Sequence, residues 1–415
     1  MERVEVLVVG AGPAGSTVAE KLAASGHEVL LVEEHAEVGY PVQCAGLVSS
    51  RVIELAGTSE MVRRPIHGAA VFGPSMRSIE FRAPNPRGFV IDRAGLDVLL
   101  AEKARRAGAR VETGVKFDRR LAGSDGGVRV QLVDASGRPR EVETRLVVGA
   151  DGVASAVARA FRLRRPVEIL PAFEYEVPES PGDPDQVEVY LGNDVSPGLF
   201  GWWIPDGSGG ARIGVAINAG AVTARAYCDR LLVRLAKRFG APIAPPSKAL
   251  VSGIPIGTVP RTTGAHVLLV GDAAAQVKPL SGGGIFVGMR CATIASQVAH
   301  SALAGADLSE PTLAEYDRRW RSEFSDEFSK ALYLRRLFLR LSDAELDRVV
   351  DALREADMAA SIVAFGDIDF PTHVARRLLR QSPSLVRLFP KALGALWSSG
   401  GSLAPELDLE PGRAA

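Results

Sequence analysis

Cysteine is scarce in this sequence, and its few copies stand far apart. Three cysteines, Cys44, Cys228 and Cys291, occur in 415 residues. Such spacing supplies neither a disulfide framework nor the thiolate cluster of a zinc or iron–sulfur centre. The six histidines are equally scattered. We therefore expect no metal site.

An excess of charge and long apolar runs are also lacking. Lys plus Arg number 49, as do Asp plus Glu, so no overall field attracts nucleic acid or an anionic membrane. No uncharged apolar run approaches the roughly 18–20 residues that cross a bilayer. The chain enters a strand at its start, with Glu5 inside it, where a secretory signal would be apolar. We expect a cytoplasmic protein without nucleic-acid partners, and any membrane contact should be peripheral, at the inner face.

What is present is the pattern of an α/β protein. Residues 4–9 are a β-branched run, helical spacing follows, and a second strand ends at Glu33. This is a βαβ unit, the entry to a parallel sheet. Between about 166 and 254 prolines cluster and short alternating runs appear, which predicts an inserted antiparallel sheet. Residues 306–398 are mostly helical in pattern.

The first motif, GAGPAG, directly follows the first strand. Its glycines, Gly10, Gly12 and Gly15, allow a tight turn, close approach to a pyrophosphate and close helix–strand packing. With Ala14 they open a helix whose free N–H groups point at the phosphates. Glu33 stands where a carboxylate can accept hydrogen bonds from ribose hydroxyls. The arrangement predicts dinucleotide binding, and the alternative is a glycine-rich turn without a ligand.

Two further strand-to-helix turns carry an aspartate. In LLVGDAAAQVKPLSGGGI, Asp272 can accept from ribityl hydroxyls, and the glycines let the backbone approach a flat ring; the alternative is a helix N-cap followed by turn residues. In VGADGVASAVAR, Asp151 stands at another sharp strand-to-helix turn and is a further candidate cofactor-binding residue. Arg93 is a candidate for a pyrophosphate or flavin-edge contact, or else an exposed ion-pairing residue. The motif LLVGDAAAQVKPLSGGGI thus supplies five predicted cofactor-binding residues: Asp272, Gly282, Gly283, Gly284 and Ile285.

The order of these motifs resembles the flavoprotein superfamily whose type member hydroxylates para-hydroxybenzoate. The resemblance implies bound FAD, with its AMP part at the first motif and its isoalloxazine near Asp272. We expect a Rossmann-type α/β fold with an inserted antiparallel β-sheet and a C-terminal helical region. The expected parts are a discontinuous FAD-binding domain (1–165 and 255–305), an antiparallel-sheet substrate domain (166–254), a helical region (306–398) and a flexible tail (399–415).

Within that superfamily the chain resembles the geranylgeranyl reductase family. Four segments carry the resemblance: GYPVQCAGLVS, FGWWIPDGSGGARIGVAI, GDAAAQVKPLSGGGIFVGM and GDIDFP. Flavin halogenases share a segment like FGWWIP, but they need a lysine after the first βαβ unit, and none occurs between Lys21 and Lys103.

The resemblance places Cys44, Ala45 and Gly46 beside the isoalloxazine. The Cys44 thiol would be catalytic, shaping the pocket or relaying a proton; the alternative is a small buried apolar residue, and pairing with Cys291 stays open. The sheet would roof the flavin, and only one of two adjacent tryptophans can face the ligand. The candidate substrate-pocket residues are Tyr190, Phe200, Trp202, Trp203 and Pro205.

The implied activity is an FAD-dependent reductase that saturates isolated C=C bonds of prenyl chains in a lipid, lipid precursor or prenylated quinone. Flavin hydride transfer with assisted protonation would do this, with NAD(P)H, ferredoxin or reduced deazaflavin as external electron donor. The alternatives are an FAD monooxygenase acting on a small or polycyclic molecule and a flavin-free binding protein. Residues 322–341, with Phe324 and Phe328 at helical spacing followed by basic residues, predict a helix able to lie on a lipid surface; the alternative is a helix that packs on its own domain.

Overall fold

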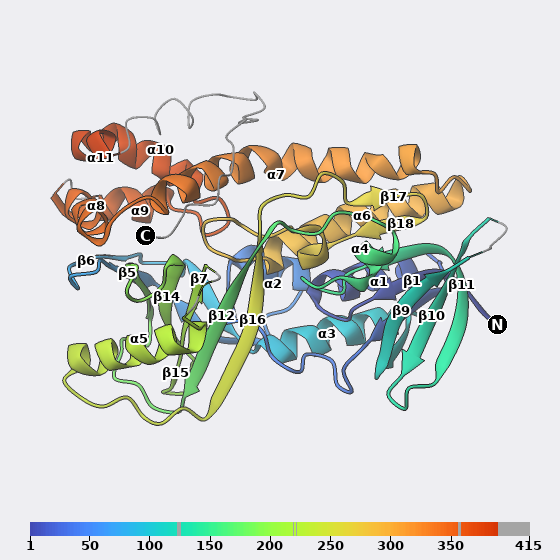
Figure 1. The fold of residues 1–415 in the computed structure, drawn as a ribbon, viewed down its shortest axis with the longest axis horizontal. Helices are drawn as coiled ribbons and strands as arrows, with labels where there is room; N and C mark the ends of the chain where they lie inside the picture. The colour runs from blue at the N-terminus through green and yellow to red at the C-terminus, as the bar shows by residue number, and fades with distance from the viewer. Residues whose placement is uncertain (123–125, 219, 221, 356–357, 389–415) are drawn as a thin grey trace.

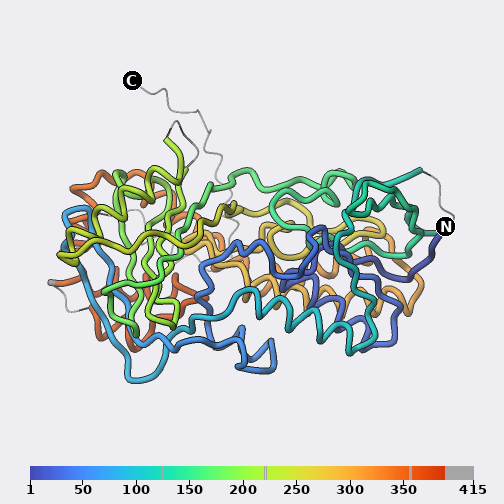
Figure 2. Tube along the Cα trace, turned by 90° about the horizontal axis from the view of Figure 1, so that it is seen from below, coloured from blue at the N-terminus to red at the C-terminus, as the bar shows by residue number. Residues whose placement is uncertain are grey.

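The computed structural model describes residues 1–388 apart from 123–125, 219, 221 and 356–357. The expected tail, 399–415, and the last ten residues of the expected helical region lie outside the described residues. Two large sheets form most of the molecule (Figure 1). In both views the antiparallel strands and the last helices, residues 343–388, lie at the end opposite the N-terminus (Figure 2).

The first sheet is parallel at its centre, as the βαβ pattern predicts. Its order is β17-β18-β11-β1-β2-β8, and β10 and β9 continue from β11. The central strands are buried on both faces, which is why they consist of continuous apolar runs. The strands are β1 (Glu2–Val9), β2 (Val29–Glu33), β8 (Arg110–Thr113), β9 (Val115–Leu121), β10 (Val128–Asp134), β11 (Pro139–Gly149), β17 (Thr263–Gly264) and β18 (Val267–Leu269).

Helices cover one face of this sheet, and the β9–β10 arm with a short helix covers the other. A 3₁₀ turn, η1, connects β18 to the helix that follows. The elements are α1 (Pro13–Ala24), α3 (Arg93–Arg106), α4 (Ala156–Ala160), η1 (Gly271–Ala274) and α6 (Ile285–Ala304).

The second sheet is mostly antiparallel, in the order β16-β12-β15-β14-β13-β5-β6, and helix α5 (Ala224–Phe239) covers one of its faces. Strands β5 and β6 come from residues 68–82, which the sequence assigns to the first domain, so this sheet uses two separate chain segments. The strands are β5 (Gly68–Phe72), β6 (Ser78–Arg82), β12 (Glu168–Val177), β13 (Gln186–Tyr190), β14 (Gly198–Pro205), β15 (Ala211–Ile217) and β16 (Lys248–Ile256).

A small third sheet connects the two halves, and its order is β3-β7-β4. Its strand β3 follows residues 39–46, which we call the Cys44 segment, and leads into helix α2. The elements are β3 (Leu47–Val48), α2 (Ser50–Ala56), β4 (Val62–Ile66) and β7 (Gly88–Ile91).

The C-terminal helices lie along one side of both sheets, with the long α7 parallel to the long axis (Figure 1). Phe324 and Phe328 are 1% exposed and pack on α6, and Arg335 is 4% exposed. The apolar stripe expected to face a lipid surface is therefore covered by the protein itself. The helices are α7 (Glu310–Phe338), α8 (Asp343–Glu355), α9 (Ala359–Phe365), α10 (Thr372–Gln381) and α11 (Pro383–Leu388). Within the described part of the chain, no helix has the length and apolar character needed to cross a membrane.

Candidate cofactor and substrate site

A cavity of about 590 Å³ runs along the carboxyl ends of the parallel strands. This volume falls within the roughly 300–1,000 Å³ of ligand sites, and this edge of a parallel sheet is where ligands bind. The predicted cofactor residues that line the cavity are Gly10, Gly12, Ala14, Glu33, Cys44, Arg93, Asp151, Asp272, Gly282, Gly284 and Ile285. The predicted residues outside its lining are Gly15, Ala45, Gly46 and Gly283.

The nucleotide end is built from the turn between β1 and α1. Gly10 has φ +101°, and a Cβ there would lie 2.4 Å from the Ala150 carbonyl oxygen. A Cβ on Gly15 would lie 1.9 Å from the Gly10 oxygen, so its role is close packing. Nothing approaches Gly12 within 4 Å on its Cβ side, which leaves room for a ligand at the helix N-terminus. The Glu33 Oε2 accepts a hydrogen bond of 2.8 Å from the Ala11 N–H and so fixes the turn.

Asp151 lines the cavity, and its carboxylate also holds the start of the next helix. Its carboxylate accepts hydrogen bonds from the N–H groups of Ala156 and Val157 and from the Ser155 hydroxyl. Because these contacts hold the start of α4, the Asp151 side chain shapes the cavity wall from behind. Gly152, next to it, has φ +69° and nothing within 4 Å of its Cβ position.

Arg93 lies inside the cavity rather than on the surface. Its side chain is 13% exposed and forms an ion pair with Asp97. Burial lowers the pKa of Arg93, but the neighbouring Asp97 and Cys44 outweigh it and keep that pKa above its usual value. Its Nε is buried and has no hydrogen-bond partner among the residues that the structure describes. An unpartnered guanidinium donor at the cavity wall fits an acceptor on the cofactor.

The flavin end is formed by η1 and by residues 277–284, which we call the flavin loop. Among the described residues, none donates a hydrogen bond to the Asp272 carboxyl, and burial raises its pKa to about 6 against the opposing Arg93 charge. Asp272 does not cap a helix, because the turn starts at Val270 without a side-chain cap. The Ser281 hydroxyl is also buried without a partner. These free polar groups and the open glycines fit FAD along the whole cavity.

Cys44 lines the cavity, whereas the two residues after it face away. The Arg212 Nη1 donates to the Ala45 carbonyl oxygen at 2.7 Å, and a Cβ on Gly46 would lie 2.3 Å from the same nitrogen. Gly46 is therefore required by Arg212 packing. Cys291 is fully buried in α6, and all three cysteines are free, so no Cys44–Cys291 pair forms.

The antiparallel sheet divides the predicted substrate-pocket residues between its two faces. Tyr190 and Trp203 are each 1% exposed and pack in the cluster under α5, and Pro205 shares that face by strand alternation. Phe200 and Trp202 lie on the opposite face, with ring centroids 6.4 Å apart. The sequence gives the alternation, but not which face α5 covers.

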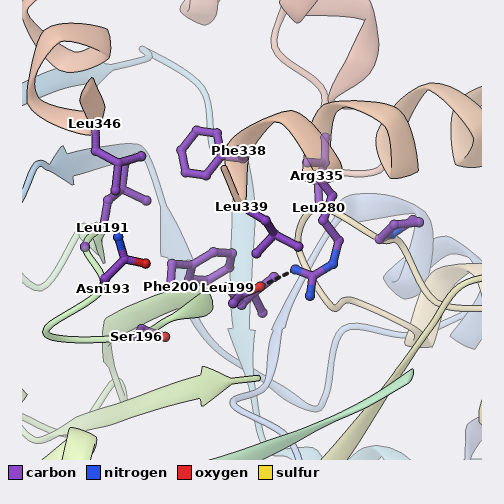
Figure 3. Close-up of a pocket in the computed structure, with 13 residues that line it drawn as sticks. Leu191, Asn193, Ser196, Leu199, Phe200, Leu280, Arg335, Phe338, Leu339 and Leu346 are labelled. Carbon is purple, nitrogen blue, oxygen red and sulfur yellow. Dashed lines mark hydrogen bonds between the residues drawn. The ribbon is translucent and has the colours of Figure 1, made fainter. Parts of the chain in front are cut away.

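A second, smaller pocket of about 130 Å³ lies on the other side of the flavin loop. Leucines from three segments and two phenylalanines surround it (Figure 3). Pro279 and Leu280 of the loop line this pocket, while Gly282 and Gly284 line the large cavity. Arg335 enters from α7 and is held by the Gly198 carbonyl oxygen and by Glu168. One loop therefore forms a wall of both spaces.

Sequence reasoning missed two buried polar side chains, Glu174 and Gln276. Glu174 is 5% exposed and accepts a hydrogen bond of 2.7 Å from the Trp202 indole. Burial raises the pKa of Glu174 to about 7, against that hydrogen bond. Gln276 links the Gly271 N–H to the Tyr316 hydroxyl of α7. Of Glu174 and Gln276, only Gln276 lies inside one of the motifs found in the sequence. Only Gln276 could therefore have been singled out from the sequence.

These features define an FAD-binding flavoprotein. A family model described as FAD binding domain matches residues 3–321. The chain is 33% identical to the digeranylgeranylglycerophospholipid reductase of Methanocaldococcus jannaschii, over 94% of this chain and 98% of that one. It is 34% identical to digeranylgeranylglycerophospholipid reductase 2 of Methanopyrus kandleri, over 92% and 98%. The chain belongs to the geranylgeranyl reductase family, which confirms the expected cofactor and the expected flavin-dependent oxidoreductase class.

A solved structure agrees with the fold. The geranylgeranyl bacteriochlorophyll reductase-like protein of Thermoplasma acidophilum superimposes with a TM-score of 0.82 at 24% identity. The match covers 95% of this chain and 99% of that one. The predicted combination of a Rossmann-type domain, an antiparallel sheet and C-terminal helices is thereby confirmed.

Proposed function

We propose that the protein is an FAD-dependent reductase that saturates isolated C=C bonds in the prenyl chains of a lipid or lipid precursor. The observation that carries the proposal is a shared loop: residues 277–284 border both the cofactor cavity and a pocket lined mainly by Leu and Phe, so the two spaces adjoin. The pocket is smaller than a whole-ligand site, so it would take a short part of a long chain. The two curated relatives support this substrate class because both are named as reductases of a digeranylgeranyl lipid.

The chemistry places specific demands on the residues around the substrate. Bound FAD would supply the hydride. A trisubstituted alkene without an electron-withdrawing group is a poor hydride acceptor, so a proton must arrive at the less substituted carbon while positive charge develops on the methyl-bearing one. Phe200, which lines the apolar pocket, offers an aromatic ring that favours such charge. The Cys44 Sγ, at the cavity wall, is the group we assign to hold the proton.

An anaerobic half-reaction tests the proposal. The purified protein is photoreduced, a geranylgeranyl-bearing phospholipid is added, and the flavin absorbance is followed together with the lipid mass. We expect reoxidation matched by the gain of two hydrogens for each flavin. A flavin that stays reduced until air is admitted, with the lipid mass unchanged, would favour a monooxygenase instead.

The electron donor in this proposal is external, either NAD(P)H, ferredoxin or a reduced deazaflavin. Each donor is offered anaerobically to the oxidised protein, and the rate of flavin bleaching identifies the one that is used. A donor whose rate does not exceed that of a chemical reductant of similar potential would be rejected.

We also propose that the C-terminal end of α7 contacts a lipid surface. Leu339 lines the apolar pocket and is 42% exposed, and Arg336 and Arg340 beside it are exposed. Each basic residue near an anionic surface contributes about 1 kcal/mol. Co-sedimentation with vesicles containing an acidic phospholipid should therefore weaken about tenfold or more in an Arg336→Ala/Arg340→Ala variant. Equal binding of both proteins to acidic vesicles would exclude this surface.

A further inference from the structure

The segment GDIDFP, residues 366–371, has no part in the function described so far, yet it reaches the flavin end. It precedes α10 and carries two aspartates that point to different parts of the molecule. The Asp369 Oδ1 lies 2.9 Å from the Lys278 Nζ, and the same ammonium donates to the Ile368 carbonyl oxygen at 2.8 Å. The side chains of Lys278 and Asp369 are 9% and 1% exposed. This is a buried ion pair between the C-terminal region and the flavin loop.

Lys278 organises the loop that carries it. Its N–H donates to the Gly283 carbonyl oxygen, and its carbonyl oxygen accepts from the Gly282 N–H at 2.9 Å. A Cβ on Gly283 would lie 2.8 Å from the Lys278 Cε, so the glycine backbone rests directly on the lysine stem. The direction of the Lys278 side chain therefore sets the position of the loop.

The other aspartate, Asp367, binds Arg51 of helix α2. Both terminal nitrogens of Arg51 lie 2.8 Å from the Asp367 carboxylate oxygens, and its Nη1 also lies 3.0 Å from the Asp369 Oδ2. The guanidinium lies over the rings of Phe286 and Phe370. Arg51 is in α2, seven residues after Cys44.

The four charges form one network that balances: two cations, Lys278 from the flavin loop and Arg51 from α2, and two anions from the C-terminal segment. Surface ion pairs contribute little, but removal of one partner from a buried pair leaves an uncompensated charge. Because a buried pair adds little net stability compared with apolar packing, we look for its role in position or charge.

We propose that Asp369 is a positioning residue for the flavin, and that residues 366–371 hold the flavin loop and the Cys44 segment at a fixed separation. Through Lys278 it fixes the loop that forms one wall of the cofactor cavity. Through Arg51 it fixes the start of α2. The proposal needs only bound FAD, so it can be tested without any prenyl substrate.

The test uses Asp369→Asn in the FAD-loaded protein, with the flavin midpoint potential and the FAD dissociation constant as readouts. The variant leaves one net positive charge beside the loop, which stabilises the reduced, anionic flavin, so the potential should become more positive. FAD should bind about tenfold more weakly, equivalent to about 1.4 kcal/mol.

Asp347→Asn is the matched control. Asp347, in α8, is 9% exposed and accepts from the Ser75 N–H and hydroxyl, away from the loop. It should lower stability while leaving the potential and the FAD affinity at wild-type values. If Asp369→Asn behaves in the same way as this control, the network is purely structural and the proposal is wrong.

Arg51→Gln keeps the proposal testable if Asp369→Asn does not fold. The Arg51 side chain is 38% exposed, so its replacement is tolerated more easily. It removes a positive charge from the same network, and the potential should move in the opposite direction, to a more negative value. An unchanged potential in Arg51→Gln would overturn the proposal by itself.

Discussion

The two ends of the cofactor cavity are built in different ways. At the nucleotide end, neighbouring residues do the work, because Gly10, Gly12 and the start of α1 present backbone to the ligand. At the flavin end, side chains from distant segments meet, and the Lys278–Asp369 pair joins residues 91 positions apart. The nucleotide end therefore depends on local backbone geometry, and the flavin end depends on the assembled fold.

The largest expected effect breaks the nucleotide end with one methyl group. Gly10→Ala places a Cβ 2.4 Å from the Ala150 oxygen at a φ of +101°. The clash and the strained φ should displace the turn and abolish FAD binding, so the purified protein should be colourless. Gly137→Ala is the control, because Gly137 has φ +81° with nothing within 4 Å. It should cost about 1 kcal/mol of stability and keep FAD. Wild-type FAD content in Gly10→Ala would contradict the backbone account.

The same contrast explains what could be predicted from the sequence. The first motif, Glu33 and the parallel strands were predictable because each is a contiguous pattern with one physical meaning. The faces of Tyr190 and Trp203 were not, because alternation defines two faces and only the packing of α5 shows which is closed. The role of Asp369 was not predictable either. Its segment, GDIDFP, contributed to the family resemblance, but its partner Lys278 lies in another motif, and only the fold brings the two side chains together.

A smaller effect tests a buried side chain whose surroundings come from separate strands. Glu174 is buried beside Trp202 and close to Arg212. Burial raises its pKa to about 7 in the folded protein, from the 4.5 of an exposed glutamate. The folded state therefore holds the proton more tightly, and the contribution of Glu174 to stability falls as pH rises from about 4.5 to 7 and stays constant above. The loss is at most about 3 kcal/mol.

Glu174→Gln keeps an acceptor for the Trp202 indole but cannot ionise. Urea unfolding at pH 5 and pH 8 should show a smaller loss of stability in this variant than in the wild type. Trp202→Phe removes the hydrogen bond that lowers the pKa of Glu174. In this variant the loss of stability with rising pH should therefore extend to higher pH than in the wild type. Identical pH dependence in Glu174→Gln and wild type would show that Glu174 does not carry this titration.

The smallest effect separates two cysteines that differ in surroundings. Cys44 lines the cavity at the flavin end, and Cys291 is fully buried in α6. Because the Cys44 thiol is assigned to the proton, Cys44→Ala should lower kcat for prenyl reduction by about tenfold or more, with stability nearly unchanged. Cys291→Ala removes a buried sulfur and should lower the free energy of unfolding by about 1 kcal/mol, with kcat unchanged. Single-turnover rates and urea unfolding measure both quantities for each variant. An unchanged kcat in Cys44→Ala would move the proton to another group, and Asp272, a cavity residue whose pKa of about 6 suits proton transfer, would then be the next side chain to replace.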